Sequence, residues 1–251
     1  MINIFRIAAN ETRRIFVSPL AWVVLAGLQF IFGGVYWLSL LDFRNNDGSM
    51  GADFGVTDYL ISGTLVGFPL VLMLLVMPMM TMRSFAEERK TGTITLLFSA
   101  PVSLTEVVLG KFLGVISFVL AIILMLAAMS FVLMPPTGYQ LDLGRIAASF
   151  LGLFLMLAAF ASAGLFVSSL TREPVVSAVL SLVLVLALWL VQIPSSYDGM
   201  PFKELWAYLS LMTHFDSLRR GVFDSADVAY YLLFSTLFLW LTVQRLDLER
   251  N

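Results

Sequence analysis

Long apolar runs separated by short polar segments dominate the pattern of this chain. A helix of about 20 mostly apolar residues, rising about 1.5 Å per residue, is long enough to cross a bilayer. The pattern therefore predicts an all-α polytopic membrane protein, built as a single transmembrane domain over residues 1–251. Six spans are expected, at residues 20–41, 59–82, 107–134, 146–170, 175–193 and 228–243.

Residues 1–17 predict an amphipathic helix that lies in the plane of the membrane surface. Arg6, Arg13 and Arg14 lie mostly opposite an apolar stripe that consists of Phe5, Ala8, Ala9, Thr12 and Phe16. Basic residues on such a helix are attracted to anionic lipid headgroups. The alternative interpretation is a basic flank that only fixes the topology. Ser18 and Pro19 then favour the start of the first span.

Two of the predicted spans have the composition of helices inside a bundle. Pro69 and Pro78 each remove a backbone donor from the second span, so we expect bends that neighbouring helices must accommodate. The fourth span is rich in Gly, Ala and Ser, which let helices approach closely. The second span contains the methionines Met73, Met77, Met79, Met80 and Met82. Their thioethers could bind copper, but we favour the interpretation that they fill the apolar core as adaptable side chains.

The segment 202–223 predicts two short interfacial or re-entrant helices, because its apolar pieces are too short to cross a bilayer. They are expected at residues 202–212 and 215–223, on either side of Thr213 and His214. His214 is the one histidine of the chain, and we interpret it as a hydrogen-bonded interfacial residue in preference to a general base.

The segment 83–105 is the only densely charged stretch between apolar runs, and it predicts a hairpin of two short helices. Serine followed three residues later by glutamate forms a capping box at a helix start, whereas glycine and proline end a helix. These signals occur in the order Ser84 with Glu87, Gly92, Thr93, Pro101, and Ser103 with Glu106. A compact hairpin held between two membrane helices offers a soluble partner a surface to bind.

Composition excludes several classes of protein. With 59% hydrophobic and 13% charged residues, the chain is too apolar for a soluble domain. Its net charge of -2 gives no reason to expect nucleic acid, and zero cysteines exclude disulfides and thiolate sites. Gly110-Lys111 is followed by Phe112, so no P-loop for phosphate is present. We therefore expect no catalytic site, metal or cofactor in this chain. The acidic residues of the loop after the first span, Asp47, Asp53 and Asp58, lack the spacing of a calcium-binding EF-hand.

Basic residues beside the predicted spans are more numerous on the side that holds both termini and the charged hairpin. Cytoplasmic loops carry such an excess of lysine and arginine. We therefore expect both termini and the hairpin in the cytoplasm.

The charged segment also resembles the stretch that follows the second membrane helix of ABC-2 type permeases, most closely that of the GldF-like and NosY-like bacterial permeases. The resemblance rests on Phe85-Ala86-Glu87-Glu88-Arg89, Gly92-Thr93, Leu96-Leu97, Ala100-Pro101-Val102 and Gly110-Lys111-Phe112. Residues 214–217 and 220–222 likewise resemble the stretch that follows the short re-entrant helices of the family.

This resemblance implies a type V exporter-like permease fold in the bacterial inner membrane, which dimerises with a second copy or with a homologous permease. Two copies of a separate ABC ATPase subunit, with ATP and Mg²⁺, would supply the energy. A periplasmic or auxiliary membrane subunit would complete some such assemblies. The complex would export or extract a substrate, or transmit force.

The resemblance also assigns roles to particular residues. Contact with the ATPase subunit is expected at Ser84, Phe85, Glu87, Glu88, Arg89, Lys90, Gly92, Thr93, Leu97 and Pro101. Glu88→Arg is accordingly expected to uncouple ATP hydrolysis from transport without unfolding the protein. Polar groups along a transport path are expected at Gln29, Ser62, Thr64 and Gln192.

Two other classes of function compete with this interpretation. A secondary carrier or channel would work without an ATPase, but ion-coupled carriers usually place ionisable residues at the membrane midplane. The clearly delimited spans contain none near their middles. An intramembrane enzyme would need a nucleophile and a base, and the sequence presents no such pair.

Overall fold

The structure is a computed structural model that describes residues 2–45, 57–99, 101–132, 142–197 and 201–250. The described residues form helices and no strand, in the order α1 (Ile2–Val17), α2 (Pro19–Asn45), η1 (Thr57–Gly67), α4 (Phe68–Thr81), α5 (Ala86–Lys90), α6 (Ile94–Ser99), α7 (Leu104–Val132), α8 (Leu143–Leu170), α9 (Pro174–Leu190), η3 (Ile193–Ser196), α10 (Lys203–Leu209), α11 (Leu211–Arg219) and α12 (Ser225–Arg250). Within these described ranges, six helical segments are long and apolar enough to cross a membrane. The expected all-α fold with six spans is thus confirmed.

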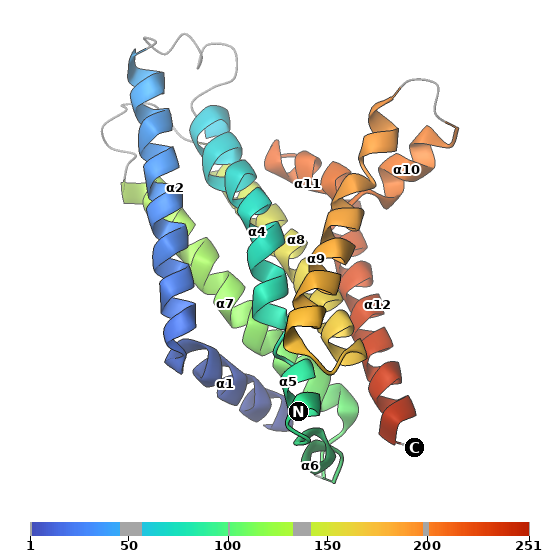
Figure 1. The fold of residues 1–251 in the computed structure, drawn as a ribbon. Helices are drawn as coiled ribbons and strands as arrows, with labels where there is room; N and C mark the ends of the chain where they lie inside the picture. The colour runs from blue at the N-terminus through green and yellow to red at the C-terminus, as the bar shows by residue number, and fades with distance from the viewer. Residues whose placement is uncertain (1, 46–56, 100, 133–141, 198–200, 251) are drawn as a thin grey trace.

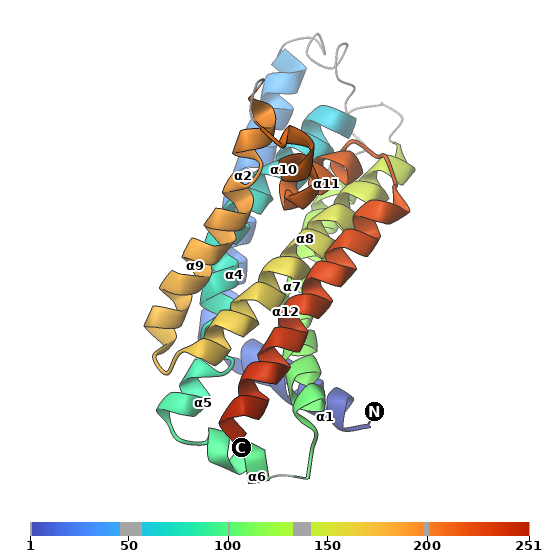
Figure 2. The same ribbon diagram turned by 90° about the vertical axis from the view of Figure 1, so that its right-hand side faces the viewer.

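The long helices form a bundle with two distinct ends (Figure 1). One end, called the terminal end here, holds the N-terminus, the crosswise helix α1, the short helices α5 and α6, and the C-terminal end of α12 (Figure 2). The opposite or far end holds α10 and α11. The hairpin and both termini therefore lie at the same end of the bundle, as an even number of spans requires.

Helix α8 occupies the centre of the bundle. Of the 18-residue apolar stretch of α8, 83% is buried inside the protein. The buried share of the corresponding stretch is 22% in α2, 17% in α9 and 22% in α12. Small residues make this possible: a Cβ added at Gly164 would lie 2.2 Å from Thr81 Oγ1 on α4. The predicted interior position of the fourth span is confirmed, and the outer helices present apolar side chains suited to lipid or to another membrane subunit.

The second predicted span consists of two helical pieces. The π-helix η1 continues directly into α4 at Phe68, and Pro69, which lacks an N–H, lies in the first turn of α4 where the two pieces meet. Pro78 lies inside α4. Met73 and Met77 are fully buried in the hydrophobic core, which supports packing as the role of these methionines. Asp47 and Asp53 lie outside the described residues.

Helix α1 packs along the first turns of α7, because two glycines of α7 let it approach. A Cβ added at Gly110 would lie 2.6 Å from Cγ2 of Ile7, and one added at Gly114 would lie 2.6 Å from the Cβ of Glu11. The close contacts at these two glycines fix the rotation of α1 about its own axis. Ile7 and Glu11 therefore face α7, whereas Phe5 of the predicted apolar stripe is exposed, and contact of this stripe with lipid stays a prediction.

Two other expectations about the last part of the chain need correction. The short helices of segment 202–223 separate at Ser210, not at Thr213 and His214, because the Ser210 side chain accepts a hydrogen bond from the Thr213 N–H and so begins α11. The last helix, α12, extends beyond the predicted span 228–243 to Arg250, and Leu246 is buried in a hydrophobic cluster with Phe85 and Ile94.

Candidate functional site

The charged segment between α4 and α7 folds into the predicted hairpin at the terminal end (Figure 1). Helix α5 and helix α6 are joined through Gly92, whose φ of 74° lies in the left-handed region that glycine adopts most easily. The capping box before α7 is confirmed: Ser103 Oγ accepts from the Glu106 N–H, and Glu106 Oε2 accepts from the Ser103 N–H, each at 3.2 Å. Local sequence therefore fixes the turn and the exit of the hairpin.

The start of α5 is capped from another part of the chain, contrary to expectation. Ser84 makes no capping bond there. Instead, Ser168 Oγ on α8 accepts from the N–H groups of Phe85 at 3.1 Å and Ala86 at 3.2 Å, and donates to the Met82 carbonyl at 3.1 Å. One hydroxyl thus uses its donor and both acceptor sites, and it attaches the hairpin to the central helix of the bundle.

A buried lysine holds the hairpin to α7 and α1 together. Lys111 Nζ on α7 lies 2.7 Å from Glu88 Oε1 of α5 and 2.7 Å from Glu11 Oε1 of α1. Its side chain is only 3% exposed, and the ammonium also lies 5.2 Å from the ring centroid of Phe85. Because an unpaired buried ammonium is strongly unfavourable, Lys111 favours the arrangement in which α1, α5 and α7 stay together.

Three further ion pairs connect the hairpin to α1 again, to the residue before α9 and to α12. The partners are Arg14 of α1 with Glu87 at 3.2 Å, Lys90 with Glu173 before α9 at 2.8 Å, and Arg89 with Glu249 near the end of α12. The Arg89 side chain is 4% exposed, so this pair is the most protected of the three. Exposed pairs contribute about 0–1 kcal/mol each, so Lys111 and Arg89 carry most of the attachment.

The tip of the hairpin remains open to solvent. Thr91, Gly92, Thr93 and Thr95 are exposed, and Leu96 exposes 69% of its surface. Beneath the tip, Ile94 is buried in a small hydrophobic cluster formed with residues of α7, α8 and α12. The hairpin therefore has a firmly held base and a free surface at its turn. We call the surface formed by Thr91–Thr93, Thr95 and Leu96 the hairpin tip.

The predicted partner contacts divide between these two parts. Ser84 and Phe85 are buried, and Glu88 and Arg89 are engaged within the chain, whereas Gly92, Thr93 and Pro101 are exposed and Leu97 is half-buried. The variant Glu88→Arg would place a guanidinium beside the buried Lys111. From this contact we expect the variant to disturb the base of the hairpin as well as any coupling to a partner.

The other predicted site residues lie apart from one another. On α1, Arg6 and Arg13 are exposed. Of the expected path residues, Gln29 is half-buried on α2, Thr64 donates to the Tyr59 carbonyl at 3.1 Å, and Gln192 lines a hollow at the far end. Ser62 is fully buried, 3.3 Å from the hydroxyl of Ser149 on α8. A path that included Ser62 would require η1 and α8 to separate.

At the far end, His214 is fully engaged in holding α11 to α12. Its Nδ1 lies 2.6 Å from Asp227 Oδ1, its Nε2 lies 3.0 Å from the Tyr208 carbonyl, and its ring stacks on Tyr230 at 4.1 Å. Both ring nitrogens are thus occupied, as the interpretation of a hydrogen-bonded interfacial histidine requires. Within the described ranges, no group of three or more His, Asp or Glu residues is placed to hold a metal ion.

Several residues of the site carried no recognisable signal in the sequence. The tertiary cap Ser168 and the carboxylates Glu11, Glu173 and Glu249 lie 82 to 160 positions along the chain from the residues that they contact. The pair Gly110 and Gly114 was detectable, because small residues four apart mark a close helix contact.

Comparison with known proteins agrees with this architecture. A family model described as ABC-2 family transporter protein matches residues 6–218, which include most of α1, the hairpin and the first five spans. No curated protein matches the chain. Since the matched interval covers most of the sequence, this multi-pass membrane protein belongs to the ABC-2 family of transporter proteins, the membrane components of ABC transporters.

Proposed function

We propose that this chain is a permease subunit, one half of a transmembrane dimer that a separate ATPase drives. Two copies, or this chain and a homologous permease, dimerise in the bacterial inner membrane with their termini in the cytoplasm. Two ATPase subunits bind ATP and Mg²⁺ and contact the hairpin tips. The subtype is the GldF-like or NosY-like one that the hairpin resembles.

The observation that carries this proposal is the unequal attachment of the hairpin. Its base is tied by ion pairs to α1, α7, α12 and the turn before α9, and by Ser168 to α8, whereas its tip carries an exposed leucine among exposed threonines. A solvent-exposed tip on a rigid base is the form expected of an element that a partner moves. Loops that only connect spans need no such attachment.

The geometry also suggests what a displacement of the tip would move. Lys111 couples α5 to both α1 and α7, and α7 continues from the hairpin to the far end as one helix of 29 residues. A force on the tip would therefore tilt α7 and carry α1 with it, as in rigid-body transitions of packed helices. Such a movement serves export or extraction of a substrate, with or without an auxiliary subunit, or transmission of force.

The direct test is capture of the ATPase by hairpin-tip variants. We expect the affinity-tagged wild-type chain to co-purify with an ATPase subunit, and Leu96→Asp to weaken this association at least about tenfold, as loss of an interface anchor does. Leu248→Asp is the matched control, because Leu248 is equally exposed and belongs to the same end of the bundle. Neither variant alters a buried residue, so both should keep the thermal stability of the wild type.

Two results would contradict the proposal. One is that no nucleotide-hydrolysing protein associates with the wild-type chain in gently solubilised membranes. The other is that Leu96→Asp and Leu248→Asp associate with the ATPase as well as the wild type does, which would remove the tip from the interface.

A further inference from the structure

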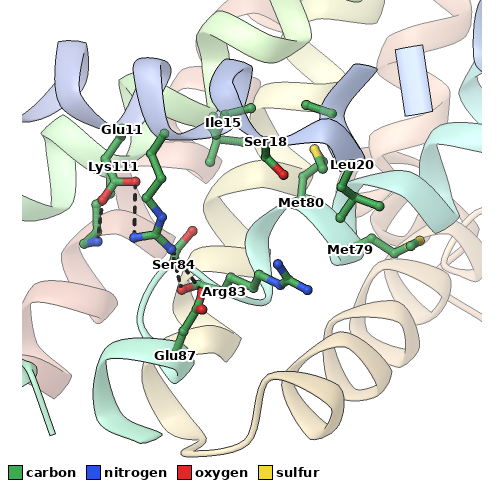
Figure 3. Close-up of a pocket in the computed structure, with 13 residues that line it drawn as sticks. Glu11, Ile15, Ser18, Leu20, Met79, Met80, Arg83, Ser84, Glu87 and Lys111 are labelled. Carbon is green, nitrogen blue, oxygen red and sulfur yellow. Dashed lines mark hydrogen bonds and ion pairs between the residues drawn. The ribbon is translucent and has the colours of Figure 1, made fainter. Parts of the chain in front are cut away.

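A pocket lies at the elbow between α1 and α2, facing the end of α4 and the base of the hairpin (Figure 3). Its volume is about 190 Å³. One part of its lining is polar, with Ser18, Arg83 and Ser84, and the other part is apolar, with Leu20, Met79 and Met80. The proposed function makes no use of this amphipathic pocket.

The charges around the pocket leave one cation without a carboxylate partner. Lys111 is paired with Glu11 and Glu88, and Arg14 is paired with Glu87. Arg83 is exposed, and none of the ion pairs among the described residues includes its guanidinium. Figure 3 shows this side chain extending away from Glu87, toward the part of the pocket beside Met79. The pocket thus presents one available guanidinium to a ligand.

The position of the pocket corresponds to the headgroup region of a bilayer. The crosswise helix α1 and the spanning helix α2 meet there, at Ser18. Nearby Trp22 is 59% exposed, and its indole N–H donates to the Phe16 carbonyl at 2.7 Å. Exposed tryptophans of membrane proteins concentrate at the membrane–water interface. A ligand in the pocket would therefore reach it most directly from the adjoining lipid leaflet.

The polar and apolar parts of the lining follow the direction of the membrane normal. Helix α4 runs toward the terminal end, so Met79 and Met80 lie farther from that end than Arg83 and Ser84, which follow α4. A ligand with a charged outer part and an apolar inner part would match both. The volume is smaller than the roughly 300–1,000 Å³ of a site that encloses a drug-sized molecule, so only a headgroup and the first carbons of its chains fit inside.

We propose that this pocket binds the phosphate-bearing headgroup of a phospholipid from the leaflet at the terminal end. The Arg83 guanidinium pairs with the phosphate, because its planar fork matches phosphate oxygens. Ser18 and Ser84 supply neighbouring hydroxyl groups, and Leu20, Met79 and Met80 contact the lipid beyond its phosphate. The bound lipid would occupy the junction of α1, α4 and the hairpin, where it would favour the attached arrangement of these elements.

Binding to the purified full-length chain tests this proposal, with native mass spectrometry of the detergent-solubilised protein as the readout. The ligands are dioleoylphosphatidylglycerol, dioleoylglycerol, which has the same chains and no phosphate, and glycerol 3-phosphate, which has no chains. The variants are Arg83→Gln and the control Arg13→Gln, whose arginine is exposed on α1 outside the pocket. Thermal unfolding of both variants verifies that they are folded.

We expect the wild-type chain to retain the phospholipid in preference to dioleoylglycerol, with glycerol 3-phosphate failing to compete. Arg83→Gln should weaken phospholipid binding about fivefold, the effect of one basic residue at a lipid surface, and Arg13→Gln should leave it unchanged. Equal losses for the two variants, or equal binding of dioleoylglycerol, would overturn the proposal. Displacement by glycerol 3-phosphate would assign the pocket to a free phosphate compound. The assay contains no ATPase, so its outcome is separate from that of the co-purification test.

Discussion

Replacing Lys111 with methionine should release the hairpin from the bundle. The substitution keeps the apolar stem of the side chain and removes the ammonium that holds Glu11 and Glu88 at 2.7 Å each. Removing one member of a buried ion pair costs about 3–5 kcal/mol. The two carboxylates retain side-chain exposures of 18% and 20%, so water can reach them, and we place the cost at the low end, about 3 kcal/mol.

Hydrogen–deuterium exchange of the hairpin amides measures this cost locally. A loss of about 3 kcal/mol in the free energy of local opening corresponds to exchange that is about 100-fold faster. The matched control is Lys90→Met in the same hairpin, because Lys90 and its partner Glu173 are each 55% exposed and such pairs contribute about 0–1 kcal/mol. If Lys111→Met leaves the exchange of residues 86–99 unchanged, or accelerates it no more than Lys90→Met does, Lys111 does not hold the hairpin.

Three further predictions concern the attachment of the hairpin and of α1. Gly110→Ala should destabilise the protein by about 1–3 kcal/mol, because the added Cβ would lie 2.6 Å from Ile7. Gly27→Ala is the control and should not destabilise it, because no atom lies within 4 Å of a Cβ added there. Melting temperatures in detergent compare the two variants. Ser168→Ala should lower the free energy of unfolding by about 1 kcal/mol and speed proteolysis within the hairpin, because two N–H groups lose their acceptor. Ser99→Ala is the control and should have no effect, because the Ser99 hydroxyl donates to the Leu96 carbonyl within α6. A double-mutant cycle of Arg89→Gln and Glu249→Gln should give a coupling energy of about 1 kcal/mol or more, and additive effects would show that the pair is not formed.

The predictable part of this structure is the part governed by local physics. Apolar length sets the number of spans, the small residues of the fourth span set its central position, and Gly92 with Ser103 and Glu106 sets the turn and exit of the hairpin. Each of these signals acts within a few residues or along one helix. Their consequences are therefore readable before the helices are placed in space.

The missed features depend on contacts between distant parts of the chain. Ser84 has the spacing of a helix cap, but Ser168 of α8 takes that place because the bundle brings its hydroxyl to the start of α5. The charges of Glu88 and Arg89 appeared to be a surface for a partner, yet Lys111 and Glu249 use them internally. Spacing alone cannot show which charges of a helical hairpin face inward.

The location and partner of the hairpin tip are the central claim, and single-cysteine labelling tests them most directly. The natural chain has no cysteine, so Thr93→Cys introduces one thiol, at an exposed position of the tip. The account predicts that a membrane-impermeant maleimide labels this thiol in inverted membrane vesicles and not in intact spheroplasts, and that a short bifunctional crosslinker joins it to an ATPase subunit. Labelling from the outer face of spheroplasts, or an ATPase that co-purifies but never crosslinks to Cys at this position, would contradict it.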